Sequence, residues 1–261
     1  MVLPEHNVVK TPSMAAFKTV THGRATLLVP AKGGEAVEYA LAHPDECTPV
    51  ESLGRGNLLK FNMPGGPGLI RPYRRGGAMR LLLRDRFWLV NRPLREFLVH
   101  VAASQSGLSV TEPLGVRFEV TWLGLVSGAI ATRALDAITL QEWLTNKPSE
   151  ARTGMLRQCG AQIRAMHDAG IYHADLQIRN ILITSEGPVI IDFDNARKVK
   201  QIAAWNRSRN LLRLRRSFTK NGFFTECFET VLEGYGPHAI PPWLDATYKA
   251  KGRISDWISM R

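Results

Sequence analysis

Long apolar runs and cysteines are both scarce in this chain of 261 residues. No apolar run reaches the roughly 18 residues that a membrane-spanning helix needs, and Glu5 and Lys10 lie where a signal peptide would have its apolar core. The three cysteines, Cys47, Cys159 and Cys227, are far apart and lack the spacing of zinc ligands. We therefore expect a protein of a reducing compartment, the cytoplasm, that neither spans a membrane nor binds zinc.

Acidic residues are too few to balance the basic ones: 34 Lys and Arg against 23 Asp and Glu give a net charge of +11. Nine Lys or Arg and no acidic residue lie in 197–220, and a second basic group comprises Arg71, Arg74, Arg75, Arg80, Arg84 and Arg86. One basic run is often only a solvated face. Two of them predict an anionic partner, such as a membrane surface or a phosphorylated substrate. Few aromatic residues interleave them, so we expect no nucleic-acid partner.

Residues 173–194 contain a motif for phosphoryl transfer. Asp175 follows His173 by two residues, Asn180 comes five residues later, and Asp192 follows a short apolar run. In kinases this pattern supplies a carboxylate that accepts the proton of the acceptor hydroxyl, and two oxygen ligands for Mg²⁺. We predict that Asp175 is the catalytic base, that Asn180 and Asp192 bind Mg²⁺, and that ATP is the donor. His173 is expected to be a packed, hydrogen-bonded support of the loop.

The surrounding pattern favours this interpretation. Apolar residues recur at helical spacing before the motif, and the helix is expected to stop at Gly170. Residues 181–183 and 189–191 predict a hairpin between the two aspartates. Taken singly, an aspartate in such a place is more often a cap or turn residue, so the order of all the elements carries the prediction.

The nucleotide-binding residues are predicted upstream. Gly54, Arg55 and Gly56 form a glycine turn whose backbone amides could approach phosphate oxygens, although an ordinary hairpin turn has the same pattern. Arg71 lies on the following strand, where kinases place the lysine that pairs with the phosphates. Lys60 is the alternative for that role.

A glutamate partner for this cation is predicted on the next helix. Residues 94–102 have helical character and place Glu96 on the first turns. Kinases pair their phosphate-binding cation with such a glutamate; the alternative is a glutamate on the surface.

The fold class that these elements predict is α+β: a bilobal, protein-kinase-like fold with a β-rich N-lobe and a mostly helical C-lobe. We expect the N-lobe at 1–132 and the C-lobe at 133–261, with the chain crossing between them near 129–134.

These segments together resemble the lipopolysaccharide kinase family, and most closely its Kdo kinases. The similarity extends over 54–218, and its most diagnostic parts are Tyr-Arg-Arg-Gly-Gly at 73–77 and Asn-Leu-x-Arg-Leu-x-Arg-Ser at 210–217. In that family an arginine stands at the position of Arg71. The resemblance implies ATP- and Mg²⁺-dependent transfer of phosphate to Kdo, at its 4-hydroxyl, on a lipid A precursor. It also implies peripheral binding to the cytoplasmic face of the inner membrane.

Three alternatives stay open at the level of sequence. The basic segment 207–220 could be an amphipathic helix on a lipid interface or, as we favour, a core helix of the C-lobe. A protein kinase is disfavoured because little chain separates Asp194 from that segment and no Ala-Pro-Glu element follows. A catalytically inactive, kinase-like binding module is disfavoured because the chain has Asp175, Asn180 and Asp192.

Overall fold

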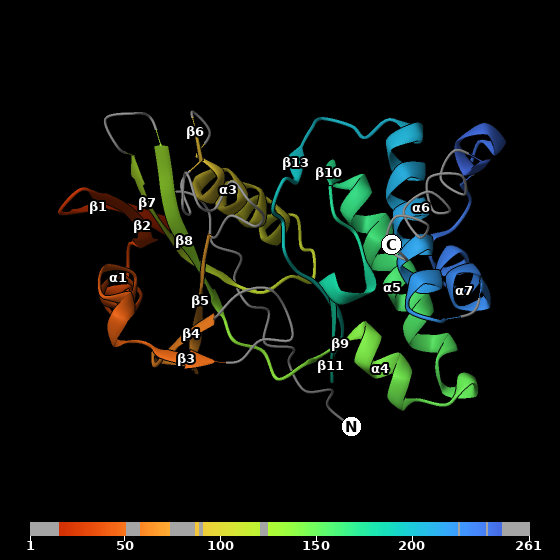
Figure 1. The fold of residues 1–261 in the computed structure, drawn as a ribbon, viewed down its shortest axis with the longest axis horizontal. Coiled ribbons are helices and arrows are strands. Elements are labelled where there is room, and N and C mark those ends of the chain that lie inside the picture. The colour runs from red at the N-terminus through yellow and green to blue at the C-terminus, as the bar shows by residue number, and fades with distance from the viewer. Residues whose placement is uncertain are drawn as a thin grey trace, which may run out of the picture.

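The computed structural model describes residues 16–50, 58–73, 87–88, 91–120, 125–223, 225–238 and 240–246. Its N-terminal part is rich in strands and its C-terminal part is mostly helical, and the two lie side by side (Figure 1). The predicted α+β class with this division of strands and helices is thus confirmed.

One antiparallel sheet dominates the N-terminal part. Along the sheet the strands run in the order β1-β2-β7-β8-β5-β4-β3, and β6 pairs with β8. Their bounds are Phe17–His22 (β1), Ala25–Pro30 (β2), Thr48–Val50 (β3), Leu58–Phe61 (β4), Gly68–Pro72 (β5), Phe87–Trp88 (β6), Pro113–Val120 (β7) and Leu125–Arg133 (β8). The predicted strand pair on either side of the glycine turn is present as β3 and β4.

A helix covers each face of this sheet. Alternate residues of a strand face opposite sides, so Ile70 of β5 packs with the helix α1 (Glu35–Ala42) on one face. Arg71 pairs in register with Ile130, which packs with α3 (Arg92–Gln105) on the other face. The sheet therefore presents Arg71 to the face that α3 covers.

The helix α3 begins and ends with ordinary capping chemistry. The side chain of Asn91 accepts a hydrogen bond from the backbone N–H of Leu94 at 3.1 Å, which satisfies one of the unpaired donors of the first turn. Gly107, just beyond the helix, has φ +74°, a conformation that suits glycine. The helix predicted at 94–102 is confirmed and is longer at both ends.

The described C-terminal part contains the helices α4 to α7, two small sheets and two 3₁₀ turns. The helices are α4 (Leu140–Asn146), α5 (Thr153–Asp168), α6 (Ala204–Lys220) and α7 (Thr225–Tyr235), and the 3₁₀ turns are η3 (Ser149–Ala151) and η4 (Ile178–Asn180). A third such turn, η2 (Pro44–Glu46), follows α1 in the N-terminal part. The short strands are β9 (Ile138–Thr139), β10 (Ile171–Tyr172), β11 (Ile181–Thr184), β12 (Gly187–Ile190) and β13 (Arg197–Lys198).

The predicted hairpin is confirmed: β11 and β12 pair antiparallel, with Ile181 opposite Ile190, and β9 pairs with the other side of β11. The helix α5 stops just before Gly170, which has φ +71°. The loop that carries Asp175 and Asn180 therefore lies between the helix α5 and a hairpin, as the pattern of apolar residues predicted.

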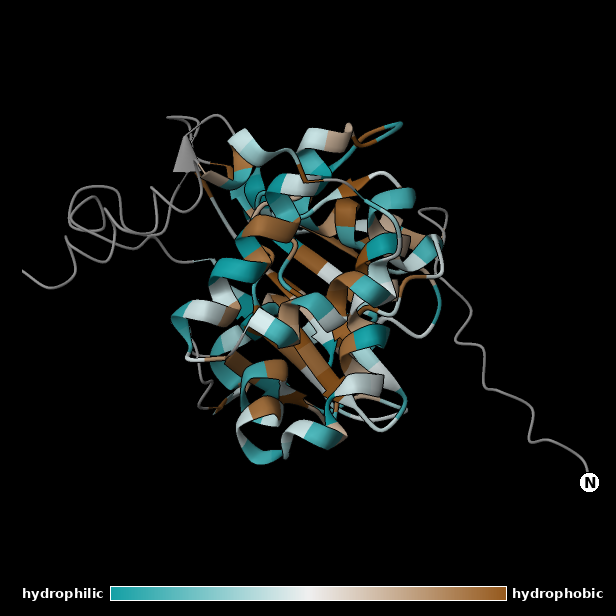
Figure 2. Ribbon diagram, turned by 90° about the vertical axis from the view of Figure 1, so that its right-hand side faces the viewer, coloured by the Kyte–Doolittle hydropathy of each residue, from teal (hydrophilic) through white to brown (hydrophobic). Residues whose placement is uncertain are grey.

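Buried apolar residues form one cluster in the C-terminal part. Figure 2 shows hydrophobic (brown) and hydrophilic (teal) positions alternating along the helix ribbons. Two glycines bring α5 and α7 into backbone contact. A Cβ atom added to Gly160 would lie 2.0 Å from the carbonyl oxygen of Val231, and one added to Gly234 would lie 2.0 Å from that of Arg157. Neither position has room for a side chain, which fixes the distance between these helices.

The connection between the two parts differs from the prediction. Residues 129–133 belong to β8, because they pair with β7 on one side and β5 on the other, so the crossing falls on residues 134–137. Arg133, at its start, donates to the carbonyls of Pro64 and Gly66 at 3.2 and 2.9 Å and pairs with Glu112. A lobe boundary close to residue 132 stays a prediction.

A second connection joins the two parts after α3. The backbone N–H of Ile190 donates to the carbonyl of Ser109 at 3.0 Å, and Val110 forms an isolated bridge with Ile190.

The three cysteines are free thiols, and Cys159 and Cys227 are buried. Among the described helices, none combines the length and the apolar character needed to cross a bilayer.

Candidate active site

Arg71 and Glu96 form an ion pair at the centre of the candidate site. Glu96 is 4% exposed, and its second oxygen accepts a hydrogen bond from the hydroxyl of Tyr73. The other neighbour of Arg71 is Asp192, whose Oδ1 lies 3.4 Å from Nη2 of Arg71. The structure thus brings together three of the predicted residues from β5, α3 and the segment after β12. Contact of Arg71 with phosphates stays a prediction.

Burial and neighbouring charges act against each other in this cluster. Burial raises the pKa of Glu96, Arg71 opposes the rise, and Asp192 and Asp194 add to it. Burial alone would lower the pKa of Arg71, but the charges of Glu96 and Asp192 outweigh it and the pKa is raised. Carboxylates outnumber the arginine here, so the cluster favours an additional cation.

Asp192 provides an oxygen that suits this cation. Its Oδ1 is buried and lacks a hydrogen-bond partner in the described part of the chain, which is costly unless something else binds it. Its backbone has φ +64°, an uncommon conformation for a residue other than glycine. A buried carboxylate oxygen that accepts no hydrogen bond, although Arg71 lies near it, is a suitable Mg²⁺ ligand.

Asn180 provides a second oxygen. Its Nδ2 donates to the backbone carbonyl of Asp175 at 2.8 Å, and its amide oxygen accepts no hydrogen bond from a described residue. The described residues contain no cluster of three or more His, Cys, Asp or Glu side chains able to bind a metal by themselves. One carboxylate and one amide still fit Mg²⁺ beside a nucleotide, because phosphate oxygens and water complete its coordination.

Asp175 is the half-exposed member of the site. Its Oδ1 lies 3.2 Å from Nη1 of Arg213, and its Oδ2 accepts a hydrogen bond from Gln177. The carboxylate is therefore held in one orientation at a surface that an acceptor can reach.

His173 is a packed, hydrogen-bonded part of the loop, as predicted. It is fully buried, its Nε2 lies 3.0 Å from the carbonyl of Ile191, and its Nδ1 lies 3.2 Å from the backbone N of Asp175. One neutral tautomer satisfies both bonds, with the proton on Nε2. Burial lowers the pKa of His173, although Ile191 and the two aspartates oppose it, and the lowered pKa favours the neutral ring.

The helix α6 fixes the catalytic loop. Its Asn210 is buried and bonds both backbone groups of His173, accepting from N at 3.2 Å and donating to O at 2.9 Å. Ser217 accepts from the backbone N–H of Ile178 at 3.2 Å. These contacts, and the burial of Leu211, Leu212, Leu214 and Phe218, confirm that 207–220 belongs to a core helix.

The Asp-Phe-Asp segment joins α3 to the catalytic loop. The ring of Phe193 lies 5.1 Å from that of His100 on α3 and 5.5 Å from that of His173, between centroids. Asp194 forms a two-point ion pair with Arg92 at the start of α3.

Sequence reasoning missed three contacts of the site: Tyr73 with Glu96, Arg92 with Asp194, and Arg213 with Asp175. Two of them had a signal, because Tyr73 and Arg213 lie in the motifs at 73–77 and 210–217 that are diagnostic of this family.

The other predicted nucleotide-binding residues are the glycine turn and Lys60. Gly54, Arg55 and Gly56 lie outside the described residues. Lys60 is exposed on β4, opposite Leu69, and in the described part of the chain it forms no ion pair with the site's carboxylates. The geometry therefore brings Arg71, and not Lys60, to the carboxylates.

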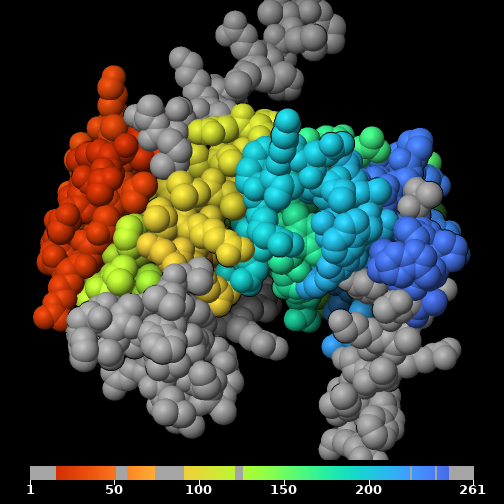
Figure 3. Space-filling model, turned by 90° about the horizontal axis from the view of Figure 1, so that it is seen from above, coloured from red at the N-terminus to blue at the C-terminus, as the bar shows by residue number. Residues whose placement is uncertain are grey.

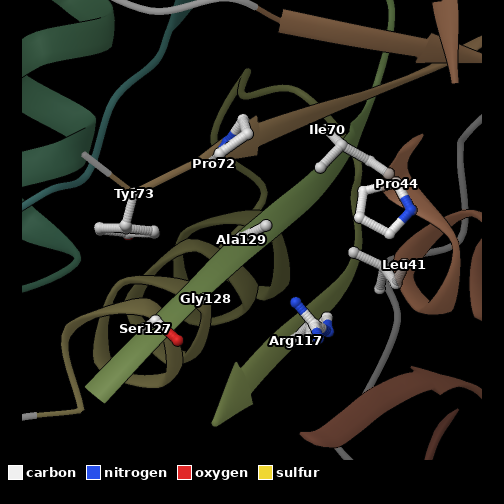
Figure 4. A pocket seen from close by; sticks show the side chains of 9 residues that line it. All are labelled: Leu41, Pro44, Ile70, Pro72, Tyr73, Arg117, Ser127, Gly128 and Ala129. Carbon is white, nitrogen blue, oxygen red and sulfur yellow. The ribbon is translucent and has the colours of Figure 1, made fainter. Parts of the chain in front are cut away.

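A small pocket lies on the other face of the sheet (Figure 4). Its lining includes Ile70 and Pro72, which alternate with Arg71 along β5, together with Leu41 from α1. It contains none of the predicted site residues, so we assign no part of the reaction to it.

A loop carboxylate, two oxygens suited to a metal and a paired arginine lie between a sheet and a helical part, and this is the arrangement of a kinase-like protein. Residues 44–235 match the lipopolysaccharide kinase (Kdo/WaaP) family, and the chain belongs to that family. It is therefore a member of a family of phosphotransferases of lipopolysaccharide biosynthesis.

Similar curated proteins carry a more specific name. The 3-deoxy-D-manno-octulosonic acid kinase of Vibrio parahaemolyticus serotype O3:K6 is 34% identical over 172 residues, 64% of this chain and 71% of that protein. The protein of the same name from Xylella fastidiosa strain M12 is 32% identical over 212 residues, 76% of this chain and 82% of that protein.

A solved structure shares the fold. WaaP, in a complex with acyl carrier protein, superposes with a TM-score of 0.60 at 15% sequence identity, covering 87% of this chain and 98% of that one. At this identity the similarity concerns the fold alone.

Proposed function

We propose that this protein transfers phosphate from ATP to the Kdo sugar of a lipid A precursor, at the 4-hydroxyl, during synthesis of the inner core. The observation that carries the proposal is the convergence of Asp175, Asn180, Asp192 and the Arg71–Glu96 pair at one site. The curated relatives named 3-deoxy-D-manno-octulosonic acid kinase support the acceptor.

Each residue has a defined task in this proposal. Asp175 accepts the proton of the acceptor hydroxyl as that oxygen forms its bond to phosphorus. Asn180 and Asp192 would hold Mg²⁺, which neutralises the charge that develops on the phosphate oxygens. Arg71, oriented by Glu96, contacts phosphate oxygens of the donor, as a planar guanidinium does well.

A protein substrate is not supported. Only residues 195–203 separate Asp194 from α6, and within them β13 pairs with β10. This leaves little chain to position a peptide.

Mass spectrometry of the product tests the proposal. The purified protein, ATP, Mg²⁺ and a Kdo-containing lipid A precursor should give a glycolipid heavier by one phosphate, and fragmentation should place it on the 4-hydroxyl of Kdo. The same incubation with the precursor lacking Kdo is the control. Equal phosphorylation of both glycolipids would reject Kdo as the acceptor.

Binding to an anionic membrane surface is part of the proposal. Basic residues and exposed apolar residues lie together around β13 and the start of α6: Arg197, Lys198, Val199 (41% exposed), Lys200 and Trp205 (47% exposed). Figure 3 looks onto the side of the molecule where these elements lie. Cations with an interfacial tryptophan are typical of peripheral attachment to anionic lipid.

Flotation with vesicles tests the attachment. Vesicles containing phosphatidylglycerol should carry the protein upward, and phosphatidylcholine vesicles should not. A variant with Lys198→Gln, Lys200→Gln and Trp205→Ala should lose most of the binding. If this variant binds as the parent does, these residues are not the attachment surface.

A further inference from the structure

Arg213 of α6 forms an ion pair with the predicted base, Asp175. Among the described residues, no other arginine of α6 is paired with it. Nη1 of Arg213 lies 3.2 Å from Oδ1 of Asp175, while Gln177 holds Oδ2. Both oxygens of the base thus have a partner, so an acceptor hydroxyl that approaches Oδ1 competes with Arg213 for it. The side chains of Arg213 and Asp175 are 38% and 49% exposed, which leaves their contact open to an incoming molecule.

The position of Arg213 is fixed by its helix. Asn210 and Ser217 lie three residues before and four residues after it, on the same face of α6, and both bond the backbone of the catalytic loop. These two anchors hold the backbone of Arg213 beside the loop. Its guanidinium therefore stays within reach of Asp175 and of a ligand bound there.

Three of the other four arginines of α6 contact residues other than Asp175. Arg207 pairs with Asp168, Arg215 pairs with Asp245, and the guanidinium of Arg209 lies 5.1 Å from the ring centroid of Trp205. Their contacts hold the C-terminal part together or lie away from the base.

The proposed acceptor supplies an anion for Arg213. Kdo is an acid, so its carboxylate must approach a base that is itself an aspartate, and like charges at such a distance repel. The fork of a guanidinium binds carboxylates by two parallel hydrogen bonds. We propose that Arg213 leaves Asp175 and binds the carboxylate of the acceptor sugar, which frees one oxygen of the base for the hydroxyl. Arg213 is then a residue that determines specificity for acidic sugars; this inference rests on the proposed function.

A comparison of two acceptors tests the inference. One is the Kdo-containing lipid A precursor, and the other is the same glycolipid with its Kdo carboxyl methyl-esterified. The parent protein should prefer the acid, and Arg213→Gln should lower this preference, the ratio of the two kcat/KM values, by about 10- to 100-fold. Arg213→Lys should keep part of the preference. The KM for ATP should change little in either variant.

Arg157→Gln is the matched control, because it removes the same charge from an exposed pair with Glu233 between α5 and α7. It should leave the preference unchanged, and thermal unfolding should show that all variants are folded. If Arg213→Gln lowers kcat/KM for acid and ester equally, or if the parent uses both acceptors equally well, the inference is wrong and the proposed function stands. If the parent phosphorylates neither glycolipid, the proposed function falls and this inference with it.

Discussion

The two halves of the candidate site differ in how they hold their carboxylates. On the donor side, Glu96 is buried and paired with Arg71, and one oxygen of Asp192 is buried without a hydrogen bond. On the acceptor side, Asp175 is half-exposed and its partner Arg213 is accessible. The proposed donor side therefore has its carboxylates positioned before any cation or nucleotide binds, whereas the proposed acceptor side is open to exchange of partners.

Asp192→Ala should have the largest effect, because it removes the only charged one of the two predicted Mg²⁺ ligands. We expect productive metal binding to be lost and kcat to fall by about 10³-fold or more. Titration of activity with Mg²⁺ measures this. Asp194→Asn, which loosens the contact with Arg92, is the control and should keep the parent's Mg²⁺ dependence. A normal Mg²⁺ dependence in Asp192→Ala would contradict the assignment of the donor side.

Asp175→Ala should lower kcat by about 10²-fold or more while the fold stays intact, because the acceptor hydroxyl loses its positioned base. Binding of Mg²⁺ and ATP, measured by calorimetry, should stay close to that of the parent. Asp168→Ala removes a carboxylate from a surface network with Arg164 and Arg207 and serves as the control. Loss of ATP binding in Asp175→Ala would show that the two sides are not independent.

Acid should destabilise both halves alike. Burial lowers the pKa of His100, behind the donor side, and of His167, behind the acceptor side, to about 4. Each ring is neutral when folded and takes up a proton when unfolded, so full stability is present above about pH 6.5 and is lost as the pH falls toward 4. The loss is about 3 kcal/mol for each histidine.

Denaturant unfolding at a series of pH values measures this loss. His167→Gln should make the free energy of unfolding less dependent on pH between 6.5 and 4 than in the parent. Because the comparison is between two variants, the opposite contribution of Glu96, whose pKa is raised, cancels. An unchanged pH dependence would mean that His167 is protonated in the folded protein.

Glu96→Gln should have the smallest effect of the four. Arg71 keeps a hydrogen-bonding neighbour but loses its charged partner, so we expect the KM for ATP to rise about 10-fold. Glu112→Gln, which removes the charged partner of Arg133 at the end of β8, should leave this KM unchanged. An equal rise in both variants would indicate a general loosening of the sheet.

Local patterns predicted much of this arrangement. The hairpin at 181–190, the helix that carries Glu96 and the helical segment 207–220 were all predictable, because apolar periodicity and capping residues act over a few positions. The pairing of Arg71 with Glu96 followed from the kinase pattern, in which the cation of this strand pairs with a glutamate of the next helix.

Contacts between distant segments were less accessible. Arg92 with Asp194 and Tyr73 with Glu96 join residues far apart in the chain, and no periodicity encodes such pairs. The crossing between the two parts was predicted near 129–134, because Ala129 and Ile130 suit the end of a strand as well as its interior. In the structure both residues pair with β5 and β7, so the strand continues past them.

The attachments between the two parts have a consequence for the site. Arg133 bonds the turn at 64–66 and Glu112, so the end of β8 is fixed where the crossing begins. In addition, Arg92 at the start of α3 pairs with Asp194, and the ring of His100 on α3 lies 5.1 Å from that of Phe193. A shift of α3 against the C-terminal part would break these contacts, so the position of Glu96 on α3 is coupled to that of the Asp-Phe-Asp segment.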